Sequence, residues 1–435
     1  MKDALNKILG DKNLTELLTG SGLVLFFKAL GMFAGYVFTY LITQYLGAES
    51  YGVYAICFTV LSIVVVVSKL GLDSASVKSI SAYITEGNQE KALLYFRKSI
   101  VVVAVSSIVT GLALYLSAGW LATVFDNDLL ENSLKVTALI VVPNALLHIQ
   151  AEKLRGLKKM AGYSFLINGS VALLAGGLFL LLINLYSAAT ETSLWALGGS
   201  ISVLCLVIFF KRDFKVKAPK WDSIPYKNMF ALSLPMLLSS SMLVIMSWTD
   251  ILLLGYYMDE TQVAVYNIAF KISAIVSIVL YAINAIASPQ FSVLFASSQN
   301  GQLKTLAMQI AKLNFFLTLP VMLGIVVFAP YILGFFGEEY HAGQTALLIL
   351  CAGQFFSAVC GSVLTLLNMA GKEKIVRNIV GGTALLNIVL NVIFIQLYGI
   401  EGAAFATFIS LILWNILGLI AVKKHFGFVM LPFIK

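Results

Sequence analysis

Long apolar stretches separated by short polar segments run through the whole chain. An α-helix needs about 20 consecutive apolar residues to cross the hydrocarbon core of a bilayer. Measured this way, the sequence predicts twelve membrane spans. They cover 21–46, 52–71, 99–121, 133–151, 161–185, 192–210, 230–257, 262–286, 305–332, 343–368, 376–397 and 402–422. We therefore expect an all-α integral membrane protein with twelve transmembrane helices and short loops.

The composition supports a membrane protein and excludes several other classes. Of the 435 residues, 60% are hydrophobic and 11% are charged, and the mean hydropathy is +0.92. Soluble domains carry about 25% charged residues, so a water-soluble enzyme, a disordered chain and a nucleic-acid-binding module are all excluded. The four cysteines lie in apolar runs without metal-ligand spacing and are expected to be buried thiols. We expect no metal site.

The distribution of positive charge predicts the orientation of the chain. If the N-terminus is cytoplasmic, all but four of the 29 Lys and Arg residues fall in cytoplasmic segments, and the outer loops are acidic. Because basic loops stay on the cytoplasmic side, both termini are expected there. The polar first 20 residues lack the short apolar core and cleavage site of a signal peptide, so the first span is expected to be an uncleaved anchor.

Two halves of six spans each are predicted. Residues 211–227 contain six bases and two prolines, as a cytoplasmic linker would, and 46–56 resembles 258–268 at an offset close to half the chain. Coincidence between short apolar strings remains an alternative. Two halves that each have an even number of spans enter the membrane in the same orientation, so the predicted repeat is parallel. Parallel halves of this kind suit alternating access. The predicted parts are a cytoplasmic segment 1–20, an N-lobe 21–210, a linker 211–229, a C-lobe 230–422 and a cytoplasmic tail 423–435.

Motifs for nucleotide and acyl-transfer chemistry are absent from the sequence. There is no Gly-x-x-x-x-Gly-Lys-[Ser/Thr] loop and no Gly-x-Ser-x-Gly elbow. We therefore expect no ATP hydrolysis and no cofactor, with a proton or sodium gradient as a candidate energy source. The predicted outer loops are too short for the usual active site of a membrane-embedded polymerase or ligase.

A few charged residues lie deep within predicted spans, where charge is expensive. Lys28 is in the first span, Asp250 in the seventh, and Lys271 in the eighth together with Asn267. A buried Lys costs at least about 2.5 kcal/mol and therefore should face a wet cavity or a partner. Asp250 and Lys271 are expected at similar depth. They either neutralise each other or also bind substrate or a coupling ion, and the two interpretations are compatible.

Two further polar groups are candidates near the inner boundary. Lys69 precedes Asp73 by one helical turn, so we expect an ion pair between them, and Lys69 is a candidate substrate contact. His148 and Glu152 share one face of the fourth span and could relay protons. They could equally be ordinary interfacial polar groups.

Several short motifs resemble a known family of membrane proteins. The most specific are Asn387-Ile-Val-Leu-Asn391 and the following 398–407, Tyr-Gly-Ile-Glu-Gly-Ala-Ala-Phe-Ala-Thr. Leu46-Gly47 with Tyr51-Gly-Val-Tyr54, Asp250 to Gly255 followed by Val265-Tyr266, and Phe335-Phe-Gly-Glu-Glu-Tyr340 also match. In this order they resemble bacterial polysaccharide (O-antigen, Wzx-type) flippases of the multidrug/oligosaccharidyl-lipid/polysaccharide exporter superfamily.

The resemblance implies a MATE-like fold of two six-helix lobes and a function in the bacterial cytoplasmic membrane. The implied substrate is an undecaprenyl-diphosphate-linked oligosaccharide for O-antigen, lipopolysaccharide, capsule or exopolysaccharide, passed on to polysaccharide polymerase machinery. Lys28 and Lys271 would hold the diphosphate or acidic sugars, and Asp250 would orient Lys271 or respond to the coupling ion. The alternatives are an ion-coupled multidrug/cation antiporter of the same superfamily, which would favour cavity acids, and a glycan polymerase or ligase.

Overall fold

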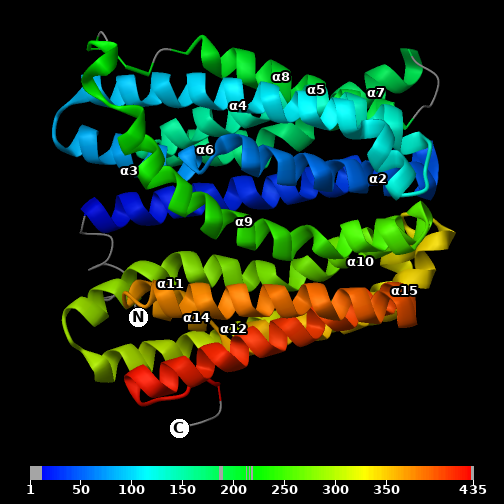
Figure 1. The fold of residues 1–435 in the computed structure, drawn as a ribbon. Helices are drawn as coiled ribbons and strands as arrows, with labels where there is room; N and C mark the ends of the chain where they lie inside the picture. The colour runs from blue at the N-terminus through cyan, green and yellow to red at the C-terminus, as the bar shows by residue number, and fades with distance from the viewer. Residues whose placement is uncertain (1–11, 186–189, 212, 215, 217–218, 433–435) are drawn as a thin grey trace. The chain divides into compact units, whose positions relative to one another are not determined.

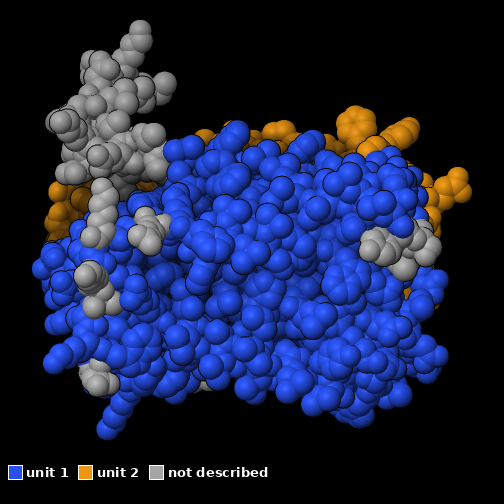
Figure 2. Space-filling view, turned by 90° about the horizontal axis from the view of Figure 1, so that it is seen from above, with its two compact units in different colours: residues 1–244 blue, residues 245–435 orange. Residues whose placement is uncertain are grey.

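The computed structural model describes residues 12–185, 190–211, 213–214, 216 and 219–432 (Figure 1). Within these ranges the chain forms helices and connecting turns, with no strand. It divides into two compact units, residues 1–244 and 245–435, which are coloured separately in Figure 2. The division falls inside α9 (Tyr226–Tyr257), C-terminal to the predicted linker. Most of the predicted segment 1–20 and the last residues of the predicted tail lie outside the described residues.

Unit 1 is built around α5 (Leu129–Gly156). This helix is buried along much of its length because α4 (Gln89–Val124), α8 (Glu191–Phe209), α2 (Lys12–Lys69) and α3 (Leu72–Thr85) all pack against it. The remaining elements of the unit are α6 (Met160–Ser164), the π-helix η1 (Phe165–Ser170), α7 (Val171–Leu185), η2 (Trp221–Ser223) and the first part of α9.

Unit 2 has α13 (Gln344–Cys360) at its centre. It packs against α10 (Glu260–Ala274), α12 (Asn300–Gly334) and α15 (Glu373–Phe426). The other elements are η3 (Ile275–Ser277), α11 (Ile278–Ala296), η4 (Glu338–Gly343) and α14 (Val363–Met369). Phe291, Leu303, Leu366 and Val422 lie in an apolar core shared by α11, α12, α14 and α15.

The first long helix is a hairpin of two legs. Gly47 has φ 81° and ψ 175°, outside the helical region and readily adopted only by glycine. Phe38 and Tyr54 lie on opposite sides of this break, yet their ring centroids are only 5.8 Å apart. In a straight helix 16 residues would separate them by about 24 Å, so the chain reverses at Gly47. This break lies between the first two predicted spans.

The last long helix contains a second hairpin. Gly399 has φ 57° and ψ −131°, and the backbone at Gly402 lies directly against the carbonyl of Phe394. Residues eight apart would be about 12 Å apart along a continuous helix, so this contact shows that the chain turns back. The reversal lies between the last two predicted spans, 376–397 and 402–422.

The outer surfaces of the helices match a lipid environment. Leu116 on α4 and Tyr331 on α12 are 74% and 77% exposed, and many other large apolar side chains are exposed on the same helices. Nine helices among the described residues are long and apolar enough to cross a membrane, and the two hairpins are counted once each. The predicted all-α, multi-pass membrane architecture is confirmed, whereas the count of twelve spans stays a prediction. All four cysteines are free and buried, as expected.

The hairpin at Gly399 generates a stability prediction. A Cβ atom at Gly402 would lie 1.9 Å from the Phe394 carbonyl oxygen, so the Gly402→Ala variant must separate the two legs. Overpacking of this kind costs about 1–3 kcal/mol, and a rigid backbone contact belongs at the upper end. We expect thermal unfolding in detergent to show a transition several degrees lower. Gly382→Ala, on the same helix with open space around it, is the control and should unfold no earlier than wild type. Equal transitions for the two variants would contradict the hairpin contact.

Candidate functional site

Unit 1 contains a cavity of about 340 Å³ between α2, α5, η1, α7, α8 and the middle of α9, where Val244 lines it. Its wall is mainly apolar, contributed by residues such as Phe58, Leu147 and Ile201. The polar groups that line it are Ser62, Lys69, Asn144 and His148. An apolar cavity with a few polar groups is the usual form of a ligand site, and this volume lies at the lower end of the usual range.

A π-helix forms one wall of the cavity. Leu166 and Ile167 of η1 line it, and η1 packs against the first leg of α2. At the crossing, a Cβ on Gly31 would lie 1.6 Å from the Asn168 carbonyl oxygen, so only glycine permits this approach. Single π-helical turns occur often at functional sites, because the extra residue re-aims the side chains around it.

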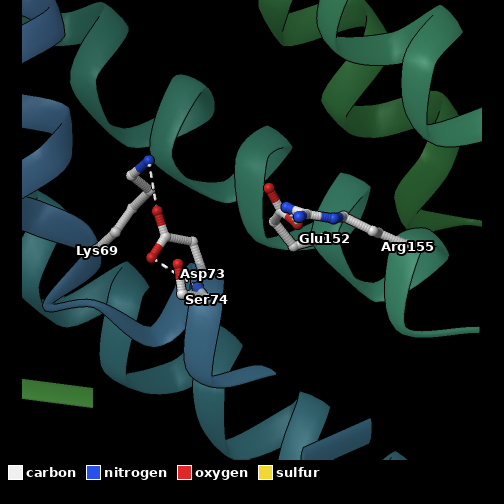
Figure 3. A network of polar contacts seen from close by, with 5 residues as sticks. All are labelled: Lys69, Asp73, Ser74, Glu152 and Arg155. Atoms are coloured by element: carbon white, nitrogen blue, oxygen red, sulfur yellow. Dashed lines mark hydrogen bonds and ion pairs between the residues drawn. The ribbon is translucent and has the colours of Figure 1, made fainter. Parts of the chain in front are cut away.

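Lys69 is the basic group of the cavity, and it is only 7% exposed. Its Nζ lies 2.9 Å from Oδ2 of Asp73, so the predicted ion pair is confirmed (Figure 3). Between the two residues the helix breaks at Leu70 (φ 50°) and Gly71 (φ 72°). A Cβ on Gly71 would lie 2.1 Å from the carbonyl oxygen of Ser233, which explains why α9 can approach so closely.

Asp73 stays ionised because of its partners. Burial alone would raise the pKa of this carboxyl, but the charge and hydrogen bond of Lys69 and the backbone N–H of Ser74, 2.7 Å away, outweigh it. The net effect holds the pKa of Asp73 below its usual value. Two opposite charges therefore persist beside the cavity.

The predicted polar face of α5 divides into two parts. Asn144 and His148 line the cavity, whereas Glu152 pairs with Arg155 at 3.3 Å. Figure 3 shows the Glu152–Arg155 pair on α5, separate from the Lys69–Asp73 pair. The guanidinium of Arg155 also lies 5.5 Å from the centroid of the Tyr163 ring. A proton relay through His148 and Glu152 stays a prediction.

Unit 2 contains a second buried polar group, centred on Asp250 of α9. Asp250 is 4% exposed and accepts three side-chain hydrogen bonds. Tyr266 donates its hydroxyl to Oδ2 at 2.7 Å, Thr407 donates to the same oxygen at 2.5 Å, and Asn391 donates Nδ2 to Oδ1 at 2.7 Å. All three donors are neutral.

The hairpin in α15 explains how two of these donors meet the same carboxyl group. Asn391 and Thr407 stand eight residues before and after the break at Gly399. Equal distances along the two legs place them at the same depth, about 12 Å from the turn. Tyr266, fully buried on α10, reaches Asp250 from a third helix.

The partners of Asp250 correct one expectation. The ion pairs between described residues do not include Asp250 with Lys271, so the predicted mutual neutralisation is wrong. Lys271 lies in the last turn of α10 and is partly exposed, and Asn267 on the same helix is buried. Lys28 is partly exposed on the first leg of α2 and does not line the cavity in unit 1.

The Asp250 group can take up a proton or a small cation. Asn391 Nδ2 also donates to Oδ1 of Asn387 at 3.0 Å, and the buried Oδ1 of Asn391 has no hydrogen-bond partner among the described residues. Carboxylate, amide and hydroxyl oxygens are the ligands of hard cations. A buried carboxylate that is compensated only by neutral donors is stabilised further when such an ion or a proton binds.

Comparison with known proteins decides the family. Residues 41–343 match the family described as polysaccharide biosynthesis protein, which is more than half of the chain. The chain belongs to this family. Probable low-salt glycan biosynthesis flippase Agl15 of Haloferax volcanii is 26% identical over 372 residues, which cover 84% of this chain and 75% of that protein. Probable flippase AglR of the same organism is 26% identical over 181 residues, covering 41% and 38%.

Solved structures agree with the family at the level of the fold. An inward-facing MATE-family multidrug transporter has a TM-score of 0.77 at 18% identity, covering 91% of this chain and 94% of its own. The lipid II flippase MurJ, in an inward closed conformation, has a TM-score of 0.73 at 14% identity, covering 93% and 87%. The resemblance to the polysaccharide flippases of the exporter superfamily is thereby confirmed, and so is the MATE-like fold.

In this polysaccharide biosynthesis protein, motifs far apart in the sequence meet at one carboxyl group. Asp250, Tyr266, Asn391 and Thr407 each belong to a motif that carried the family resemblance, but only Asp250 was expected to be a site residue. A sequence signal for Asn391 was the pair of asparagines, Asn387 and Asn391, one turn apart in an apolar span. The contact of Asn391 with Asp250 could not be predicted without knowing which helices pack together.

The Lys69–Asp73 pair generates a pH prediction. A carboxyl group with a lowered folded-state pKa stabilises the fold above its unfolded-state pKa of about 3.9, and that contribution is lost as pH falls through the lower folded-state value. Asp73→Asn should therefore lower stability by about 1–3 kcal/mol at pH 7, because Lys69 loses its charged partner. The difference in unfolding temperature from wild type should shrink below about pH 4. Thermal unfolding in detergent from pH 3 to 7 measures it.

Glu86→Gln is the control for this series. Glu86 is exposed at the end of α3, and the variant should follow wild type throughout the pH range. An Asp73→Asn difference that stayed constant or grew as the solution was acidified would contradict the proposed ionisation.

Proposed function

We propose that this protein is a flippase that moves a lipid-linked oligosaccharide across the cytoplasmic membrane during surface polysaccharide biosynthesis. The proposed substrate is an oligosaccharide on a polyprenyl diphosphate such as undecaprenyl diphosphate, and the movement is by alternating access without ATP hydrolysis. The observation that carries the proposal is the buried, ion-paired Lys69 at the cavity of unit 1, in a chain of the polysaccharide biosynthesis family.

The cavity supports an anionic, partly sugar-like ligand. Lys69 provides a positive charge in a largely apolar wall, and Asn144 and His148 provide hydrogen-bonding groups of the kind that sugar hydroxyls use. Asp73 compensates the charge of Lys69 while no substrate is bound. A phosphate oxygen that approaches Lys69 then competes with Asp73. The substrate binds by exchanging one anionic partner for another, so the lysine need not lose its charge.

The remaining predicted contacts belong to the same proposal. Lys28 and Lys271 add positive charge on α2 and α10, and Asn267 adds an amide on α10. They would attract the diphosphate or acidic sugars at other stages of the passage. Both termini are proposed to be cytoplasmic, and the product would reach polysaccharide polymerase machinery in the outer leaflet.

Replacing Lys69 tests the function. In cells that depend on this gene for surface glycan, Lys69→Gln should lower export at least tenfold, because one unpaired or missing charge contact costs about 1.5–3 kcal/mol. Surface glycan is measured by labelled lectin, and membrane levels by immunoblot. Lys78→Gln removes an exposed lysine of α3 and should export at the wild-type level. Wild-type export by Lys69→Gln at equal membrane levels would contradict the proposal.

We infer that the Asp250 group couples transport to a proton or sodium gradient. The support is its chemistry: a buried carboxylate, three neutral donors and the unsatisfied amide oxygen of Asn391. Binding of a cation or proton would neutralise the carboxylate and favour one packing of α9, α10 and α15 over another. Transport would then follow the gradient of the bound ion.

Asp250→Asn tests this coupling. In proteoliposomes an imposed sodium or proton gradient should accelerate translocation by wild type several-fold, and the variant should translocate at one rate with or without the gradient. Asp128→Asn, an exposed carboxylate that makes no cap hydrogen bond, is the control and should respond as wild type does. A variant that still responds fully to the gradient would show that coupling occurs elsewhere.

The two alternatives predict different outcomes in the same assays. A multidrug/cation antiporter would move a cationic dye and leave lipid-linked glycan in place. A polymerase or ligase would lengthen or transfer the glycan rather than move it. The cavity at Lys69 favours neither alternative, since the ionic group that the described residues place in it is a lysine paired with an aspartate outside its wall.

A further inference from the structure

A second and larger cavity, of about 1100 Å³, lies in unit 1 between α4, α5, α8 and residues that follow α8, namely Lys211, Asp213, Phe214, Val216 and Trp221. It shares no lining residue with the cavity at Lys69. Its lining combines basic side chains, including Arg97 and Lys211, with apolar and aromatic ones, including Val101, Phe209 and Trp221. None of these residues is used by the proposed transport function.

The floor of this cavity is held in place by a buried ion pair. Asp213, whose side chain is 1% exposed, lies 2.7 Å from Nζ of Lys153 and 2.7 Å from Nζ of Lys159. The ammonium of Lys153 also lies 4.7 Å from the ring centroid of Phe96. Burial would raise the pKa of Asp213, but hydrogen bonds and charges of the two lysines outweigh it and lower the pKa. Asp213 is therefore an anion, and each of its two oxygens lies 2.7 Å from a lysine ammonium.

The other end of the segment is also anchored. Lys98, 2% exposed, donates to the carbonyl of Ile224 at 2.8 Å, and its Nζ lies 5.1 Å and 4.2 Å from the rings of Trp221 and Tyr226. Among the described residues of 213–226, which we call the strap, Asp213 is thus attached to α5 and Ile224 to α4. The cavity is a built feature of unit 1, because buried charges hold its walls.

Two basic side chains of the cavity that are not part of these anchors indicate an anionic ligand. Arg97 and Lys211 are exposed, and neither belongs to an ion pair among the described residues. Arg97 lies three residues before the apolar run of α4 that begins at Ile100, and Lys211 lies two residues after the end of α8, so both lie at the predicted cytoplasmic boundary of the membrane. Basic pockets between transmembrane helices on this side suit phosphate head groups.

The apolar lining indicates that the anion carries acyl chains. Val101 is 44% exposed and Phe209 is 61% exposed, on apolar helices that are long enough to cross a membrane. Trp221, 43% exposed, is of the type that lies at head-group level. A cavity of this volume is at the upper end of the range for drug-sized ligands, which is far larger than inorganic phosphate requires.

We propose that the cavity binds an anionic phospholipid, with its phosphate on Arg97 and Lys211 and its acyl chains along Val101 and Phe209. The lipid fills the space under the strap and ties the strap to the membrane surface. Because the strap continues directly into α9, bound lipid would restrain the start of the helix that also lines the Lys69 cavity. The site is separate from the substrate path, so it can stand if the proposed transport function fails.

Lipid titration of the purified protein tests the site. In neutral detergent, added phosphatidylglycerol should raise the unfolding temperature of wild type in a saturable way, since a ligand that binds only the folded state stabilises it. Arg97→Gln/Lys211→Gln should bind phosphatidylglycerol at least about tenfold more weakly, from the loss of two charge contacts with an anionic lipid. Native mass spectrometry should show a retained phosphatidylglycerol on wild type only.

The control removes the same charge from outside the cavity and the strap. Lys78→Gln/Lys91→Gln replaces two exposed lysines of α3 and α4 that do not line the cavity, and this variant should bind as wild type does. If both double variants bind phosphatidylglycerol equally weakly, the effect comes from the net charge of the protein, and the proposed site is wrong. An equal response to phosphatidylcholine would overturn the role of the phosphate charge, and an equal response to inorganic phosphate would overturn the role of the acyl chains. If the double variant unfolds early without lipid, Lys211→Gln alone should show the weakened binding.

Discussion

The requirement that every charge inside the membrane-embedded helices be compensated determines much of this structure. Transferring an isolated charge into a low-dielectric interior costs several kcal/mol even after relaxation. Among the described residues, Lys69 is paired with Asp73 and Asp250 accepts three hydrogen bonds. Asp213, outside the helices, lies between two lysines. The backbone breaks at Leu70–Gly71 and at Gly399 bring the partners of Lys69 and Asp250 into contact.

The three compensated charges suit three different tasks. Lys69 has a competing anion beside it, so a phosphate can exchange with Asp73 at little change in net charge. Asp250 has only neutral donors, so it gains most from a bound cation or proton. Asp213 is saturated by its two lysines, which makes it a structural anchor and leaves other bases free for lipid. The polysaccharide biosynthesis family and the MATE-like fold agree with a flippase of glycan biosynthesis, and these sites support the lipid-linked substrate that we propose.

Much of the fold could be predicted from the sequence because its signal is local. Apolar length and loop charge predicted an all-α membrane protein, with turns near Gly47 and Gly399, and helical spacing predicted the Lys69–Asp73 pair. Contacts between distant segments could not be predicted in this way. Asp250 and Lys271 share a depth, but depth along two helices does not say which faces meet, and Asp250 turns instead toward Tyr266, Asn391 and Thr407. The ion pair of Asp213 with Lys153 could not be predicted, because the composition of residues 211–227 is that of a cytoplasmic linker.

The most direct test of the central claim is translocation of a polyprenyl-diphosphate-linked oligosaccharide in proteoliposomes that contain only the purified protein. Substrate placed in one leaflet is followed by its loss of protection from an added glycosidase. The account predicts that wild type exposes the protected glycan much faster than protein-free liposomes, without ATP, and that Lys69→Gln does not. Translocation by wild type at the rate of protein-free liposomes would contradict the account, and so would translocation by Lys69→Gln at the wild-type rate.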